Sequence, residues 1–414
     1  MGSWTLTLLS TLVLSACGSG GGESASSSVG GMPPPPVPQV DNEQVVDEDE
    51  TGKEAPNIIL IVGDDIAFDH YGFTGHPIVQ TPTLDGLADV SIRYPNTYVA
   101  SHCRPTQAGL LTGLPQHRHR VTYLVGPGLS RVTTLPDRLV NAGYASYQAG
   151  KFWEGEPDRY GFTDFMPFTS RTGALELGRR TIQPVLDFIA QTTSPWFIWF
   201  TPRMPHSPHR APELYRSQYE DLGLNKETVE YYAMISWFDA VVADVLAAVG
   251  EQTVVIYLAD NGYIQSPLPE IPARRSKVSL YERGVRTELL IRLPGEPAGL
   301  RPSPASVPDV VRTILSLAGA YWEDLPGRDL FSEPSEEARA FGSLWALQFI
   351  DSRRRLAARF ARQGDTKLID RRVGRDELYN LAADPNEHDN LIDDPDWFIV
   401  QSELRVALDH WWSR

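Results

Sequence analysis

NIILIVGDD, at residues 57–65, is the segment from which the fold of this chain can be predicted. Its first part, Asn57–Val62, is a continuous apolar run rich in β-branched residues, which is typical of a strand covered on both faces. Phe197–Phe200 (FIWF) and Val254–Ala259 (VVIYLA) have the same character. We therefore predict three buried strands of one mostly parallel sheet.

Helical periods lie between these runs. Thr134–Ala142 and Thr181–Ala190 repeat apolar residues at helical spacing, and Glu227–Val249 is a long amphipathic run that Gly250 closes. The alternation of strands and helices predicts an α/β fold, a three-layer sandwich around a large mostly parallel sheet.

The alternation weakens after about residue 330. Lys367–Asp370 and Glu377–Leu381 are predicted to be short strands, and a final helix is predicted near Trp397–Trp412. We therefore predict a main domain over residues 56–332 and a small C-terminal α+β subdomain over residues 333–414.

The N-terminal residues are predicted to lie outside the fold. An apolar run ends in LSAC at residues 14–17, which resembles a bacterial lipobox and implies a signal peptide (1–17), cleavage before Cys17 and a lipid on its sulfur. Residues 18–55 are rich in Gly, Ser, Pro and acids, which is typical of a disordered tether. We expect an exported, lipid-anchored bacterial envelope protein that contacts the membrane through Cys17. Gly18 follows the cysteine directly, and in this it resembles lipoproteins that are sent to the outer membrane. A periplasm-facing location is the alternative.

The first four residues, MGSW, carry no Lys or Arg, so a plain signal peptide or a misassigned start is the other interpretation of this segment.

The chain holds 37 basic and 53 acidic residues, a net charge of −16, which argues against a nucleic-acid partner. Its two cysteines, Cys17 and Cys103, exclude a disulfide framework. The sequence does not predict an oligomeric state.

Acidic and amide side chains follow two of the predicted strands directly. Asp64 and Asp65 end the first run, and Asp260 and Asn261 follow VVIYLA. Because ligands gather at the carboxyl ends of parallel strands, we expect these side chains to converge. Three carboxylates and an amide oxygen suit Ca²⁺ or Mg²⁺ and are a poor match for zinc. The alternative is that each pair caps a following helix or turn.

Cys103 is the second landmark. It begins CRPTQ (residues 103–107), after Ser101 and His102 and before AGLLTG at residues 108–113. A loop of small residues that runs into a helix N-terminus is expected to lower the pKa of a thiol and to suit an anionic ligand. The alternative is a buried structural cysteine.

These motifs together, in this order, resemble the sulfatase family of the alkaline-phosphatase superfamily, which implies an alkaline-phosphatase-like sandwich. The matching segments are Asn57–Asp65, Cys103–Gly113 (C-x-P-S-R-x-x-L-x-T-G), Gly150–Gly155 (G-K-W-H-L-G), Pro205–His209 (P-H-x-P-H), Asp260–Gly262 (D-N-G), Lys277–Arg286 (K-x-x-x-Y-E-G-G-x-R) and Glu377–Leu391 (E-L-Y-N-L-x-x-D-P-x-E-x-x-N-L).

The resemblance implies a metal-dependent hydrolase of sulfuric esters. In this family the signature cysteine is oxidised to formylglycine, whose hydrate attacks the sulfur, while a divalent cation, usually Ca²⁺, polarises the sulfate. Lys151 and Lys277 are implied to neutralise charge on the sulfate oxygens, and His206 to contact the sulfate or protonate the leaving oxygen. The implied metal ligands are Asp64, Asp65, Asp260 and Asn261, with the nucleophile at Cys103 also at the metal.

Two departures from the family's pattern matter for the chemistry. The family's modifying enzyme recognises C-x-P-x-R, and here the arginine position holds Gln107. Glutamine donates hydrogen bonds but carries no charge. The histidine of G-K-W-H, which assists the formylglycine hydroxyls, is replaced by Trp153, whose indole cannot take a proton at neutral pH. Both departures fall on the machinery that makes and uses formylglycine.

Three hypotheses follow. The first is a sulfatase with its nucleophile at Cys103, as formylglycine or not, acting on a small-molecule or glycan sulfate ester. The second is a hydrolase of phosphate or phosphonate esters that uses unmodified Cys103, because both substrates are tetrahedral oxyanions. The third is a non-catalytic binder of sulfated glycans. The substrate depends on loops such as Phe68–His76, Leu124–Arg131 and Gln265–Arg275, whose Arg274 and Arg275 are predicted either to be solvated or to meet a second anion.

Overall fold

The computed structural model describes residues 55–122, 126, 128–129, 131–167, 173–193, 195–331, 338–345 and 356–413. They belong to one compact unit that begins at Glu54. The predicted signal peptide, the lipidation site at Cys17 and all but the last residue of the predicted tether lie outside the described residues.

The described strands form one large sheet in the main part of the chain and one small sheet near its end. The large sheet has the order β4-β3-β5-β1-β6-β7-β2-β8, and β9 also pairs with β2. Its strands are β1 Ile58–Gly63, β2 Ile92–Tyr98, β3 Ala145–Gly150, β4 Asp164–Phe165, β5 Trp196–Thr201, β6 Val254–Ala259, β7 Arg286–Arg292, β8 Gly299–Leu300 and β9 Ala305–Ser306.

The three predicted strands are confirmed as β1, β5 and β6. β1 lies between β5 and β6 and pairs with both in parallel, in the centre of the sheet. β7 runs antiparallel to both of its neighbours, β6 and β2, so the sheet is mostly but not wholly parallel. This arrangement brings the carboxyl ends of β1 and β6 side by side.

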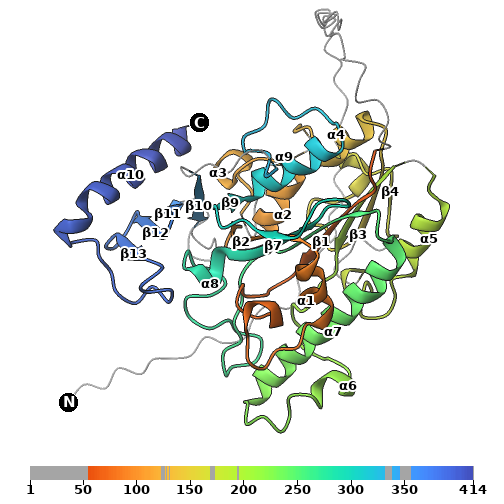
Figure 1. The fold of residues 1–414 in the computed structure, drawn as a ribbon, viewed down its shortest axis with the longest axis horizontal. Helices are drawn as coiled ribbons and strands as arrows, with labels where there is room; N and C mark the ends of the chain where they lie inside the picture. The colour runs from red at the N-terminus through yellow and green to blue at the C-terminus, as the bar shows by residue number, and fades with distance from the viewer. Residues whose placement is uncertain are drawn as a thin grey trace, which may run out of the picture. The chain divides into compact units, whose positions relative to one another are not determined.

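Helices cover both faces of the large sheet, which gives the predicted three layers. The helices of this part of the chain are α1 Pro82–Asp89, α2 Cys103–Thr112, α3 Gln116–His119, α4 Leu135–Asn141, α5 Gln183–Gln191, α6 Glu213–Arg216, α7 Lys226–Val249, α8 Glu282–Val285 and α9 Val307–Leu317, with short 3-10 turns at Gly72–Thr74, Pro157–Tyr160 and Gly173–Leu175. Another 3-10 turn, Pro395–Trp397, precedes the C-terminal helix. In Figure 1, α1 and α7 lie on one side of the sheet, and α2, α4 and α9 lie on the other.

Alternate residues of β1 supply the two core layers. Ile59 and Ile61 pack with α1, α5 and α7, whereas Ile58, Leu60 and Val62 pack with α2, α4 and α9. All of these side chains are buried, because successive residues of a strand point to opposite faces of the sheet. An unbroken apolar run therefore indicates a strand with a helix layer on each side.

The predicted helices are confirmed to within two residues at their ends. A capping box between Thr134 and Asp137 starts α4. The side chain of Asn225 accepts the backbone N–H of Thr228 at the start of α7, and Gly250, with φ 72°, follows its end. Among the described residues, α7 is long and apolar enough to cross a bilayer, but it is largely buried and belongs to the core.

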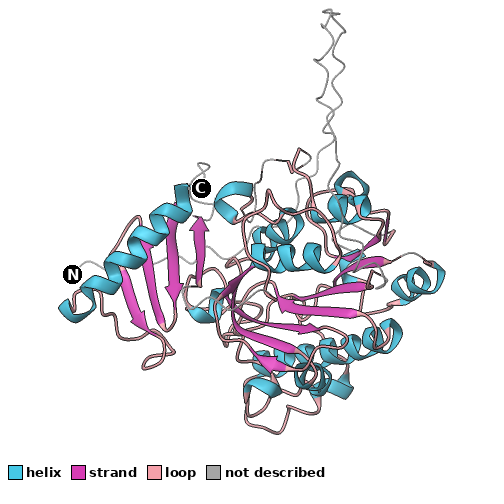
Figure 2. Cartoon of the chain, turned by 45° about the horizontal axis from the view of Figure 1, so that its top comes forward, coloured by secondary structure: helices cyan, strands magenta, loops and turns pink. Residues whose placement is uncertain are grey.

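The C-terminal part is a four-stranded antiparallel sheet with one helix, as Figure 2 shows. Its elements are β10 Arg339–Trp345, β11 Leu356–Gln363, β12 Thr366–Arg371, β13 Glu377–Asn380 and α10 Phe398–Ser413. Leu404 and Leu408 of α10 pack on Leu368 and Leu378 of the sheet. The predicted α+β character is confirmed, and the two strands β10 and β11 are additions to the prediction.

Candidate active site

The acid pairs of β1 and β6 meet, as their positions at parallel strand ends predict. Gly63 is paired with Ala259, so Asp64 and Asp260 leave the sheet next to each other. Ligand atoms of Asp64, Asp260 and Cys103 all lie within 4.8 Å of one another, and those of Asp64, Asp65 and His206 do so as well. The structure therefore brings these predicted site residues together.

Lys151 and Lys277 each contact one of the carboxylates of this cluster. Lys151, just after β3, has its Nζ 2.6 Å from Oδ2 of Asp64, and Lys277 has its Nζ 2.5 Å from Oδ1 of Asp65. Burial alone would lower the pKa of each lysine, but the adjacent carboxylate raises it above its ordinary value. Both lysines are therefore charged at neutral pH.

The carboxylates respond differently to these neighbours. Burial would raise the pKa of Asp65, but Lys277 and then His206 hold it well below its usual range. Burial, followed by the charge of Asp64, raises the pKa of Asp260 well above its ordinary value. Because three carboxylates face two lysines, the cluster has an excess of negative charge when all are ionised.

Several buried oxygen atoms of the cluster have no hydrogen-bond partner. They are Oδ1 of Asp64, Oδ1 of Asn261 and Oε1 of Gln107. An unpaired buried acceptor costs free energy unless a cation or a donor meets it. One carboxylate oxygen and two amide oxygens without partners, beside the other carboxylates of the cluster, form a donor set that fits a hard divalent cation such as Ca²⁺ or Mg²⁺.

The backbone of Asp65 is strained at this point. Its φ is 75°, in the left-handed region that non-glycine residues seldom occupy. The side chain of Asn261 donates to Oδ1 of Asp65 at 2.7 Å, and the hydroxyl of Tyr231 donates to its main-chain oxygen at 3.0 Å. Strained residues persist where the surroundings over-determine them, and they are frequent at functional sites.

Cys103 is the first residue of α2, as the sequence predicted, and is buried. The predicted lowering of its pKa is wrong: burial raises the pKa of the thiol to about 11, despite the opposing charges of Lys151 and Lys277. The helix N-terminus and two lysines do not compensate for the loss of water and for the nearby carboxylates. The unmodified side chain is therefore a neutral thiol at neutral pH.

His206 lies on the loop after β5, with its Nε2 3.7 Å from Oδ2 of Asp65. Burial lowers its pKa to about 4, so the ring is neutral at pH 7. Arg179 holds this loop, because its guanidinium donates to the main-chain oxygens of His206 at 2.7 Å, Arg203 at 2.9 Å and Pro208 at 3.0 Å. No local pattern in the sequence marks Arg179 for this role.

The two departures from the family pattern both face the cluster. Gln107, one helical turn after Cys103, has its Nε2 3.4 Å from Oδ2 of Asp260. The ring of Trp153 lies with its centroid 5.2 Å from Nζ of Lys151, a cation–π arrangement. Both replacements thus lie next to charged groups of the site.

The sequence analysis missed two supports of the site. Arg104 forms a bidentate ion pair with Glu154, at 2.9 and 3.2 Å, which ties the start of α2 to the loop that carries Lys151. Thr106 donates its hydroxyl hydrogen to the main-chain oxygen of Asp260 at 2.6 Å. Glu154 stands at the leucine position of G-K-W-H-L-G, and this charged replacement is the signal from which the ion pair could have been suspected.

Both arginines of the Gln265–Arg275 loop, Arg274 and Arg275, are exposed, as the solvated alternative predicts. Arg275 also donates to the main-chain oxygen of Glu387 at 2.5 Å and lies 4.4 Å from the ring centroid of Tyr281. The Leu124–Arg131 loop lies partly outside the described residues.

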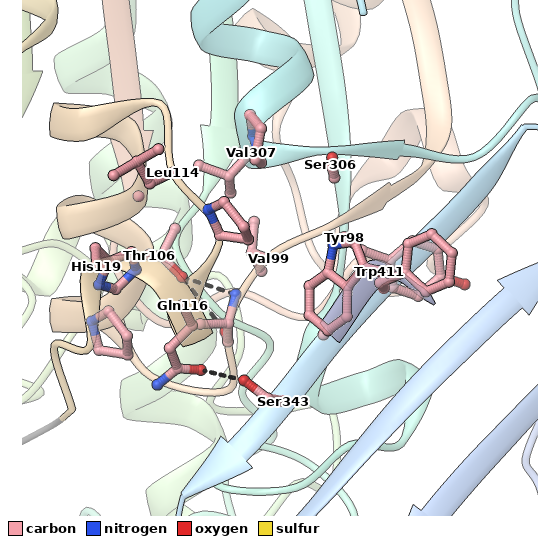
Figure 3. A pocket seen from close by; sticks show the side chains of 17 residues that line it. Tyr98, Val99, Thr106, Leu114, Gln116, His119, Ser306, Val307, Ser343 and Trp411 are labelled. Carbon is pink, nitrogen blue, oxygen red and sulfur yellow. Dashed lines mark hydrogen bonds between the residues drawn. The ribbon is translucent and has the colours of Figure 1, made fainter. Parts of the chain in front are cut away.

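A separate small cavity of about 60 Å³ lies between α2, the start of α9 and the C-terminal sheet. Figure 3 shows Thr106, Val307, Ser343 and Trp411 among its lining. None of the acids or lysines of the cluster lines it.

Comparison with known proteins points to one family. A sequence profile of the Sulfatase family matches residues 56–320. Mouse (Mus musculus) arylsulfatase J is 26% identical over 345 residues, 70% of this chain and 57% of that protein. Human (Homo sapiens) arylsulfatase A is 27% identical over 333 residues, 64% of each chain. The chain thus spans about 60% of the length of these curated relatives.

Solved structures share the fold at low identity. The phosphonate monoester hydrolase of Agrobacterium radiobacter has a TM-score of 0.69 and 18% identity, over 86% of this chain and 95% of that one. A structure solved with its substrate D-glucosamine-2-N,6-O-disulfate has a TM-score of 0.72 and 18% identity, over 87% and 98%. These similarities confirm the alkaline-phosphatase-like sandwich.

Proposed function

This chain belongs to the sulfatase family, and we propose that its acid and lysine cluster hydrolyses sulfuric esters. The observation that carries the proposal is the meeting of Asp64, Asp65 and Asp260 beside residue 103, with Lys151 and Lys277 on the carboxylates. A sulfate ester is a tetrahedral oxyanion, and such a substrate requires a concentrated positive charge to bind and to react.

A divalent cation, Ca²⁺ or Mg²⁺, would supply part of that charge and would polarise the sulfate oxygens. The residues that would hold it are Asp64, Asp65, Asp260 and Asn261, with residue 103 beside them. The excess of carboxylates over lysines and the unpaired buried oxygens support this assignment.

Lys151 and Lys277 would bind the sulfate oxygens and stabilise the charge that grows on them. Each is charged, largely buried and fixed in position by its carboxylate. His206 would act as a neutral hydrogen-bond donor to the sulfate or to the leaving oxygen, because burial keeps its pKa at about 4.

The nucleophile would be residue 103 after conversion to formylglycine. Without a cation the pKa of the thiol is about 11, so an unmodified Cys103 would then be thiolate in only about one molecule in 10⁴ at pH 7. The hydrated aldehyde has two hydroxyls and does not depend on a thiolate. Gln107 at the arginine position makes the extent of conversion the quantity to measure.

Hydrolysis of phosphonate or phosphate esters is the second candidate. The fold shared with a phosphonate monoester hydrolase favours it, since that enzyme also acts on a tetrahedral oxyanion. A protein that binds sulfated glycans without turnover is the third candidate.

Because one solved structure of this fold holds a sulfated glucosamine as its substrate, we propose a sulfated sugar as the substrate class.

The decisive experiment combines a mass measurement with paired assays. The tryptic peptide containing residue 103 is weighed for the aldehyde, and turnover of an aryl sulfate, an aryl phosphate and a phosphonate monoester is measured with Ca²⁺ and with a chelator. We expect aldehyde, turnover of the sulfate, and loss of turnover on chelation. Preferential turnover of the phosphonate by unmodified protein would establish the second candidate, and binding without turnover the third.

Two variants make the assay specific to the cluster. Asp260→Ala is expected to abolish hydrolysis, because it removes a carboxylate that the cation needs. Asp221→Ala, at an exposed position, is the matched control and is expected to leave activity unchanged. Undiminished turnover in Asp260→Ala would refute the assignment of the site.

We further propose that the protein is exported as a lipoprotein, with Cys17 acylated and residues 18–55 as its tether to a membrane. We also propose that the chain divides after residue 332 into a catalytic domain and a C-terminal subdomain. Cys17→Ser is expected to move the protein from the membrane fraction to the soluble fraction of cells. Retention in the membrane fraction would contradict anchoring through Cys17.

A further inference from the structure

Lys277 lies in a loop whose backbone is strained on both sides of it. Arg275 has φ 60° and Val278 has φ 71°, both in the left-handed region. Val278 is β-branched, which makes this conformation especially unfavourable. Residues in such a conformation persist only where their surroundings hold them.

Glu387, which follows β13 in the C-terminal part, contacts both ends of the loop. Its main-chain oxygen accepts a hydrogen bond from Arg275 at 2.5 Å. Its Oε2 accepts the backbone N–H of Glu282, the first residue of α8, at 2.6 Å. A single buried residue therefore binds the chain shortly before and shortly after Lys277.

The carboxylate of Glu387 is itself fixed by a buried charge cluster, which consists of Glu282, Arg362, Lys367 and Glu387. Nζ of Lys367 in β12 donates to Oε1 of Glu282 at 2.8 Å and to Oε1 of Glu387 at 2.9 Å. Arg362 in β11 donates to Oε2 of Glu282 at 3.2 Å. Such a cluster is weak evidence for stability but can specify one arrangement of the chain.

The middle of the loop is fixed relative to the nucleophile. The backbone N–H of Val278 donates to the main-chain oxygen of Ser101, two residues before Cys103, at 3.0 Å. At Gly284 in α8, a Cβ atom would lie 2.4 Å from the main-chain oxygen of Ser276, so the loop and α8 are packed without free space. Displacing α8 would therefore displace Lys277.

We propose that Glu387 is a positioning residue, which holds the Arg275–Glu282 loop so that Nζ of Lys277 lies against Asp65 beside residue 103. The C-terminal part of the chain thereby becomes part of the active-site machinery, although none of its described residues belongs to the cluster of acids and lysines. The inference rests on the proposed function, in which Lys277 binds the charge of the substrate.

The experiment compares Glu387→Ala and Glu387→Gln with Asp370→Asn. Asp370 is the matched control, because it accepts from Arg359 at 2.7 Å within the same sheet and has no contact with the loop. Turnover of an aryl sulfate, melting temperature and amide hydrogen exchange of residues 276–285 are measured on the full chain with its cation.

We expect Glu387→Ala to lower kcat by roughly 10- to 100-fold, since small displacements of a catalytic group cost this much. Exchange of the 276–285 amides should accelerate by about tenfold or more, because the hydrogen bond to Glu282 is lost. Glu387→Gln should restore part of kcat and part of the protection from exchange, because its amide oxygen can still accept from the backbone N–H of Glu282. Asp370→Asn should change neither kcat nor the exchange of these amides, even if it lowers the melting temperature as much as Glu387→Ala does.

A kcat for Glu387→Ala within about twofold of that for Asp370→Asn, or an unchanged exchange of the loop, would overturn the proposal. If Glu387→Ala does not fold, Arg275→Ala removes the hydrogen bond to Glu387 and the ring contact with Tyr281 at one end of the loop, and it should accelerate exchange and lower kcat in the same direction. If the wild-type protein turns over no sulfate ester, the proposed function fails, while the exchange measurement still tests whether Glu387 positions the loop.

Discussion

Replacing Asp260 by asparagine should stabilise the protein without metal and abolish its stabilisation by metal. Asparagine keeps the shape of the side chain and can still accept from the backbone N–H of Asp65, which lies 3.3 Å from Oδ1 of Asp260. It removes a carboxylate whose pKa burial and Asp64 raise well above its ordinary value. An acid with a raised pKa destabilises the fold when it is ionised.

The magnitude follows from the geometry. Oxygen atoms of Asp64 and Asp260 lie within 4.8 Å, and two unit charges at that distance repel by about 3.5 kcal/mol at an effective dielectric constant of about 20. Lys151 offsets part of this, so we expect a gain of about 3 kcal/mol. For the compact unit of Glu54–Arg414, that free energy corresponds to a rise in melting temperature of about 4 °C.

The assay is thermal unfolding of the wild type, Asp260→Asn and the exposed control Asp158→Asn, each in chelator and in excess Ca²⁺. The wild type should gain about 2.7 kcal/mol when the ion is at 100 times its dissociation constant. The variant should melt higher than the wild type in chelator and gain little from Ca²⁺. In chelator, the advantage of the variant over the wild type should grow as the pH rises above about 4, because Asp260 then ionises in the unfolded chain while the fold still holds its proton. A variant that melts lower in chelator and still responds fully to Ca²⁺ would refute the reasoning.

Three further outcomes are expected. Lys151→Met should lower the free energy of unfolding of the metal-free protein by about 3–5 kcal/mol, because it leaves the carboxylate of Asp64 buried without its cation; a loss below about 1 kcal/mol in chemical denaturation would contradict this. Unmodified Cys103 should react with iodoacetamide at pH 8 about 10²-fold more slowly than a free cysteine, since its pKa is about 11; alkylation at the rate of a free thiol would show that the pKa is not raised. His206 should stay neutral from pH 8 to about 5 in a nitrogen-detected NMR titration, because burial lowers its pKa to about 4; a midpoint above 6 would be inconsistent with that burial.

Local pattern was enough to predict the centre of the fold and the place of its chemistry. The runs that end at Val62 and Ala259 are apolar, and the structure buries both strands between helix layers. The convergence of Asp64 and Asp260 followed from one rule, that parallel strands end at the same edge of a sheet. Strands with buried charges were missed instead: Glu288 in β7 pairs with Arg93, and Arg359 in β11 pairs with Asp370.

The sequence by itself therefore determined which segments are buried and which side chains lie at the sheet edge, because the spacing of apolar residues along the chain indicates which residues are buried. Only the tertiary structure decided the ionisation of Cys103, which depends on how completely water is removed from it. It also decided the anchoring of the Lys277 loop by Glu387, because Arg275 and Glu387 are separated by 112 positions in the chain. Electrostatic partners act across space, and no local pattern encodes which distant charge will face a given side chain.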